Sequence, residues 1–431
     1  MEIIGSLILS LTQSILFYGK QIGISMLIFE VVCNGIILFV LNQKEKIQNK
    51  AGLWLMVPIV LLSSTYFIFA NRTFYVANIF VIFALNFIMY VILTNLKGTL
   101  TNYLYKTGLL FTDTVGEWQD GLKLSKEVVN EHLSVKKKTV NFKKIAKSVL
   151  IVCVVVGIVL ILLSSADSIF ANLFSGIGCI FTHINTANIF NLILRIVIMV
   201  MVYFLFLSFI LKVQDEFEED EYRREVEVKD TFTIKMLLVT LNIVYLVFCF
   251  IQIQSLFAKI NIRNSFDYAN YARSGFFQLM FVSFINLAVI LISNRYNAKK
   301  EKNIKILNLM LVVFTIIIAI SSMYRMHMYE MEYGLTYLRM FVYIILITEI
   351  IAFIPIVKYI LDDKFDFMKW CFGICIGAYC VANLMNIENI IVSRNLTRES
   401  IRSIDYNYLS NIASEDSYII LEDKLQDQNI D

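Results

Sequence analysis

About ten runs of roughly twenty apolar residues recur along the chain, and they limit its possible folds more than any other feature. A helix of this length crosses about 30 Å of hydrocarbon, and lipid offers the backbone no hydrogen-bond partner outside a helix. The sequence therefore predicts an all-α, polytopic transmembrane helical bundle with about ten membrane helices, or eleven if the short stretch 4–17 also crosses. We place the ten helices at approximately 21–41, 53–70, 74–95, 148–164, 189–211, 233–255, 275–293, 304–322, 338–358 and 368–387.

Composition supports a membrane protein and offers little sign of catalysis. Of the residues, 58% are hydrophobic and 17% charged, whereas about a quarter are charged in an ordinary soluble domain. A net charge of +3 gives no reason to expect a nucleic-acid partner. With only three histidines, no zinc motif and no glycine-rich phosphate loop, we predict no metal and no cofactor. Whether the protein is an enzyme stays open, with a non-enzyme favoured.

Lysine and arginine predict the orientation, because they concentrate in cytoplasmic loops. Basic residues alternate from loop to loop along the whole chain. The basic loops that we assign to the cytoplasm are 42–52, 96–147, 212–232, 294–303 and 359–367. This predicts a multi-pass protein of a bacterial cytoplasmic membrane with an external C-terminal tail.

The same reasoning divides the chain into three parts. Residues 1–145 hold the first membrane helices and a long basic loop, 146–390 the main bundle, and 391–431 the external tail. Within the basic loop, 136–147 could bind anionic lipid head groups, although a positive anchor for the next helix is the plainer interpretation. The acidic segment 215–230 is interpreted as a solvated linker or a short charged helix. The lipid bilayer is the one partner predicted, and protein partners are not indicated.

Three ionisable side chains fall at membrane depth, where a charge costs several kcal/mol. Glu30 has Asn34 one helical turn away, Glu349 follows Thr348, and Arg195 lies near one end of its helix. Carboxylates facing an interior path could carry protons or ions. Alternatively, each side chain is hydrogen-bonded to a neighbouring helix and locks the packing.

Polar and aromatic residues gather in the segments 268–278, 321–339 and 383–409, all predicted to be external. We expect these segments to lie together at one end of the bundle. Arginine and tyrosine together can bind an anion or a polar head group, but they also form ordinary interfacial belts. The candidate binding residues are Arg273, Arg325, Tyr329, Tyr333 and Arg394.

The order of these segments carries a family resemblance. YARSGFFQL, then SSMYRMHMYEMEYGLTYLR, then SRN followed by IDYNYL is similar to bacterial multi-pass membrane proteins grouped as domains of unknown function 4153 and 4173. The resemblance is clearest over 145–415. It implies a membrane topology and no particular activity.

Transport of a small solute, ion or lipid is the function that these features favour, with Glu30 and Glu349 lining the path. One alternative is a membrane-embedded enzyme or binding module that acts on an envelope component at the external face. Another is an assembly or sensing partner. Met326, His327 and Met328, with Met323 and Met331 nearby, could bind copper, but methionine is commoner simply as an interface residue. Metal binding by Cys371 and Cys375 is less well supported because no histidine or carboxylate cluster accompanies them.

Overall fold

The computed structural model confirms an all-α membrane protein. Nine helices in its described part are long and apolar enough to cross a membrane. They match nine of the ten predicted spans. The tenth, 148–164, lies outside the described residues, as do 136–147 and 215–230. The structure describes residues 1–69, 73–96, 98–116, 121, 123–125, 186–214, 231–257, 265–296, 301–362, 364–397, 406–412, 417–420 and 422.

The first of two compact units comprises residues 1–48 and 107–216. Its main helices are α1 (Glu2–Phe17), α2 (Ile24–Gln43) and α9 (Thr186–Lys212). Helix α1 packs along both α2 and α9, and Lys44, just beyond α2, forms a 2.8 Å ion pair with Glu2. Buried serines spaced four residues apart allow the close approach, as small residues do in membrane helix pairs. These serines are Ser6, Ser10 and Ser14.

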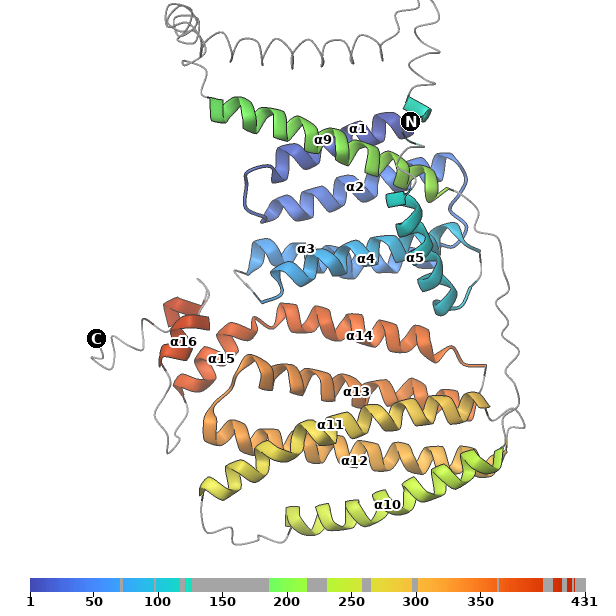
Figure 1. Cartoon of the computed structure of the whole chain (residues 1–431), viewed down its shortest axis with the longest axis vertical. Helices are drawn as coiled ribbons and strands as arrows, with labels where there is room; N and C mark the ends of the chain where they lie inside the picture. Colours follow the sequence, from blue (N-terminus) through green and yellow to red (C-terminus); the bar gives the residue numbers. More distant parts are fainter. Residues whose placement is uncertain are drawn as a thin grey trace, which may run out of the picture. The chain divides into compact units, whose positions relative to one another are not determined.

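The second unit comprises residues 49–106 and 217–431 and holds the remaining described helices (Figure 1). Its elements are η1 (Lys50–Leu55), α3 (Met56–Ile68), α4 (Tyr75–Thr94), α10 (Thr231–Phe257), α11 (Ser265–Tyr296), α12 (Lys302–Tyr333), α13 (Tyr337–Leu361), α14 (Phe367–Leu384), α15 (Ile387–Leu396) and α16 (Tyr406–Ile412). Helix α5 (Leu100–Gly116) contributes to both units. Successive contacts join α11 to α12, α12 to α13, α13 to α14 and α14 to α3.

Two residues in the left-handed backbone region mark where helices end. Gly334, with φ of +82°, ends α12, and α13 begins at Tyr337. Asn386, with φ of +45°, separates α14 from α15, and its side chain accepts a hydrogen bond from the Asn389 amide. Glycine and asparagine tolerate this conformation best, so each helix stops where such a residue stands.

Large apolar side chains remain exposed on the outer faces of the helices. In the apolar windows of the spans, the buried share ranges from 17% in α10 and α14 to 56% in α4. Ile243 on α10 is 60% exposed and Phe281 on α11 is 62% exposed. A soluble protein rarely exposes apolar patches of this extent, so these faces need lipid around them.

Candidate functional site

Polar side chains form layers inside the second unit, between α11 and α12. Ser293 donates a 2.7 Å hydrogen bond to Asn308, and Asn286 donates a 3.1 Å bond to Thr315. The paired positions are seven residues apart on both helices, so both layers lie on the facing sides of an antiparallel pair. All four side chains are at most 2% exposed. A polar seam therefore runs between α11 and α12.

Glu349 on α13 continues this seam from the third helix. It is 6% exposed, and one of its oxygens, Oε2, lies 2.8 Å from the hydroxyl of Ser283 on α11. The same hydroxyl lies 2.7 Å from the Met280 carbonyl. A serine hydroxyl carries one proton and cannot donate to both oxygens at once. The one donor of Ser283 is therefore divided between the Glu349 carboxyl group and the backbone of its own helix.

Several polar atoms of the seam lack a partner. Buried atoms without a hydrogen bond include Glu349 Oε1, Asn308 Nδ2 and Asn242 Oδ1. Asn242, on α10, donates to the Leu307 carbonyl beside Asn308. Because an unsatisfied buried polar atom costs about 1–3 kcal/mol, such atoms point to water or an ion as the missing partner.

Glu30 and Arg195 belong to the first unit. Asn34 donates to the Glu30 backbone oxygen at 2.9 Å and to its carboxylate at 3.2 Å. Arg195 donates to the Ser14 hydroxyl at 2.8 Å and to its carbonyl at 3.2 Å, and lies over the Tyr18 ring. These contacts of Arg195 hold α9 against α1. This matches the alternative in which Arg195 is hydrogen-bonded to a neighbouring helix.

The end of the second unit where α12 stops, α13 begins and α15 lies is called the polar end. At its centre is Glu330, whose carboxylate accepts a 2.8 Å bond from the Tyr343 hydroxyl. Arg394 on α15 lies 3.4 Å from the same carboxylate, and His327 Nδ1 lies 3.7 Å away. The carboxylate thus links three helices. Glu330 is buried, whereas the Arg394 side chain is 57% exposed.

The other predicted binding residues make separate contacts and do not form one cluster. Tyr329 and Tyr333 lie with ring centroids 4.8 Å apart on α12. Arg325 donates to the buried Gln252 side chain of α10 at 3.1 Å. The backbone of Arg273 belongs to α11, but its side chain lies outside the described residues. The segments around Glu330 and Arg394 therefore meet, and the expected place of 268–278 beside them stays a prediction.

A second polar cluster joins α4 to α14. Asn78 donates to Asn383 at 2.7 Å and accepts a 2.7 Å bond from the Tyr379 hydroxyl. Asn78 is 3% exposed and Asn383 1%. Since two of these hydrogen bonds run between the helices, the cluster is suited to holding α4 and α14 together.

A family model described as "Domain of unknown function (DUF4153)" matches residues 56–423. The chain belongs to the DUF4153 family. The match begins well before residue 145, so it reaches further towards the N-terminus than the quoted motifs indicated. No curated protein and no solved structure matches the chain.

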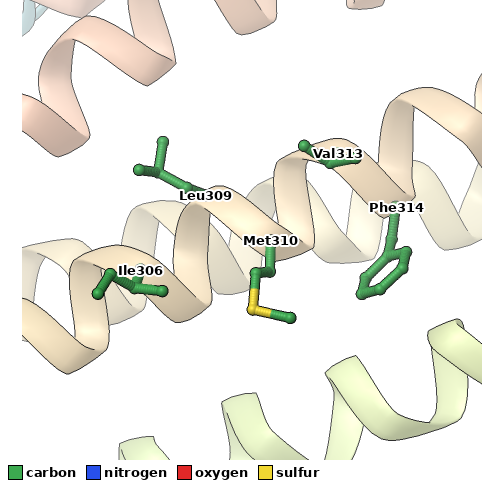
Figure 2. A pocket seen from close by; sticks show the side chains of 5 residues that line it. All are labelled: Ile306, Leu309, Met310, Val313 and Phe314. Atoms are coloured by element: carbon green, nitrogen blue, oxygen red, sulfur yellow. The ribbon is translucent and has the colours of Figure 1, made fainter.

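This DUF4153 protein also has an apolar groove of about 350 Å³ beside α12. Figure 2 shows the five side chains that line it: Ile306, Leu309, Met310, Val313 and Phe314. All five are apolar, so the groove suits an acyl chain rather than a polar substrate. Within the described ranges, no group of three or more His, Cys, Asp or Glu side chains is placed to hold a metal ion.

In this DUF4153 protein, Glu349 was predicted from the sequence, whereas the polar layers of α11 and α12 were not. Asn308 and Thr315 are seven residues apart on α12, as are Asn286 and Ser293 on α11. This spacing was visible in the sequence and could have identified the two layers. Arg339, at the polar end, was also missed, because it stands at the edge of a predicted span, where an arginine usually reaches water.

Proposed function

We propose that this DUF4153 protein moves protons across the membrane, with Glu349 as the group that binds and releases the proton. The observation that carries the proposal is the buried, unpartnered Oε1 atom of Glu349 at the middle of α13. A carboxyl group at such depth is costly, and its usual explanation is a role in ion or proton movement.

The polar seam supports a route for the proton. From Ser283 to Ser293 the seam covers ten residues of α11, or about 15 Å at about 1.5 Å per residue, which is half of the hydrocarbon thickness. Hydroxyl and amide groups along it can pass or hold water. Leu311 and Val312 are buried beside the layers, so the proposal includes entry of water between them during the cycle.

The competing explanation is that the seam only holds the helices together. Interhelical hydrogen bonds in membrane proteins contribute about 0.6 kcal/mol on average, and the three buried side-chain pairs of the seam would serve that purpose. The two explanations differ at Glu349. Glutamine keeps the size and the hydrogen bonding of the side chain but cannot release a proton.

Proton flux in liposomes tests the proposal. The purified protein is reconstituted with a pH-sensitive dye inside, and a potassium diffusion potential drives protons inwards. We expect flux above that of protein-free liposomes, and its loss in Glu349→Gln at equal reconstitution. Glu332→Gln, which removes another carboxylate at the polar end, is the matched control and should keep the flux. Wild-type protein that conducts no faster than empty liposomes, or an active Glu349→Gln, contradicts the proposal.

The proposed orientation places the basic loops in the cytoplasm of a bacterial cell and the C-terminal tail outside. It rests on the alternation of basic residues along the chain. A cysteine introduced at Asn141 should resist an impermeant thiol reagent in intact cells, and one at Ser414 should react. The reverse labelling pattern would invert the orientation and place the polar end on the cytoplasmic side.

A further inference from the structure

We propose that Arg339 forms a binding site for a phosphate group at the polar end, separate from the proton route. Arg339 is 8% exposed. Its guanidinium lies 4.2 Å from the ring centroid of Tyr329 and 6.0 Å from that of Tyr333. The two rings that the sequence suggested for anion binding thus surround an arginine that the sequence analysis did not single out.

No acidic side chain in the described part of the chain pairs with the buried charge of Arg339. Its Nη1 donates to the Gly334 carbonyl, and no carboxylate of the described residues lies within 4.0 Å of the guanidinium. A guanidinium has five N–H donors, and one carbonyl accepts from one of them. Buried arginine is normally paired with an acid, so this position favours an anion as a further partner.

The helix that carries Arg339 adds a second, independent reason. Arg339 is the third residue of the 25-residue helix α13. The first turn of a helix carries partial positive charge and favours anions over cations. An arginine there is unfavourable by itself, whereas an anion bound beside it would interact with both the guanidinium and the helix N-terminus.

Glu330 does not remove this imbalance. Its carboxylate is held by Tyr343, on the same helix as Arg339, and by Arg394. Tyr343 stands one helical turn after Arg339 on α13, so Glu330 is near Arg339 but is not a direct partner. Glu388 on α15, the other buried glutamate at this end, is 1% exposed and accepts a 3.4 Å bond from Thr73, and it forms no ion pair with Arg339 among the described residues.

The chemistry of the site favours a phosphate group. A planar guanidinium binds phosphate oxygens through two parallel hydrogen bonds, and the aromatic rings restrict its rotation. The site stands at the end of a membrane helix, at the depth where phospholipid head groups lie. The same group could come from a lipid head group or from free phosphate.

Thermal denaturation of the full-length protein in neutral detergent distinguishes these sources. One titration uses sodium phosphate against sodium chloride at equal ionic strength. The other uses short-chain phosphatidylglycerol against diacylglycerol with the same chains. Stabilisation by phosphate alone identifies a free-phosphate site, stabilisation by the lipid alone identifies a head-group site, and stabilisation by both shows that the phosphate group suffices. No stabilisation of the wild type by either probe overturns the proposal.

Variants at Arg339 assign the effect to this residue. In Arg339→Gln, the half-maximal probe concentration should rise about tenfold or more, which corresponds to about 1.4 kcal/mol. Lys364→Gln, an equal charge loss at an exposed position beyond the opposite end of α13, should respond like the wild type. If Arg339→Gln does not fold, Arg339→Lys replaces it, because lysine keeps the charge but not the two-pronged geometry. An unchanged response in the variant that folds contradicts the assignment.

Discussion

Replacing Ser283 with alanine tests whether the Glu349 site is built as described. The change removes one oxygen atom and leaves α11 helical, since alanine is the best helix former. It deletes the only protein hydrogen bond of the Glu349 carboxyl group among the described residues. Both carboxyl oxygens of Glu349 would then be buried without a protein partner.

The expected cost follows from that loss. An interhelical hydrogen bond in a membrane protein contributes about 0.6 kcal/mol on average and up to about 1.7. Leaving a buried polar group unsatisfied costs about 1–3 kcal/mol. Because Ser283 is fully buried and Glu349 is 6% exposed, we expect Ser283→Ala to lower the free energy of unfolding by about 1.5 kcal/mol. In a Glu349→Leu background, no carboxyl group is left without a partner. There, Ser283→Ala should lower the free energy of unfolding by about 0.5 kcal/mol or less.

The assay is reversible unfolding of the purified protein in mixed micelles, with all four proteins of the double-mutant cycle measured together. The difference between the two costs is the coupling energy of the pair. A coupling energy near 1 kcal/mol supports the contact. A coupling energy indistinguishable from zero would refute the reasoning, because residues that do not touch add independently.

Two further predictions concern the polar end. Tyr343→Phe should destabilise the protein by about 1.5–3 kcal/mol, because it removes a bond to the buried Glu330 carboxylate. Arg394→Gln should cost under about 1 kcal/mol, since the ion pair of Arg394 with Glu330 is half open to water. Unfolding in mixed micelles gives both values, and a larger cost for Arg394→Gln would contradict the account. Arg325→Ala should lower the melting temperature by breaking the contact with Gln252 and leave proton flux per molecule unchanged, so a loss of flux at normal abundance would make Arg325 a site residue instead.

The membrane helices could be predicted because length and hydropathy alone decide which segments cross lipid. Their ends were less predictable. The sequence suggested that the span at 304–322 stops at Ser322, but α12 continues to Tyr333. The polar-aromatic residues after Ser322 are compatible with a helix, and the chain turns only at Gly334, where φ is positive.

The candidate site was predictable only in part. Glu349 and Glu30 stand out in any apolar run, because ionisable residues there are rare. The partner Ser283 comes from another helix, 66 residues away, and one sequence does not reveal which helices meet. Arg339 illustrates the same limit, because the lack of a paired acid in the described part of the chain is a property of the packed polar end rather than of the local sequence.

The central claim is that Glu349 exchanges its proton with water although it is buried inside the membrane bundle. Infrared difference spectroscopy of the reconstituted protein tests this most directly, by following the C=O stretch of protonated carboxyl groups. The account predicts a band that shifts on transfer to D₂O, changes with bulk pH, and is absent from Glu349→Gln. A Glu349-dependent band that neither shifts in D₂O nor responds to pH would show a sealed structural carboxyl group and would contradict the claim.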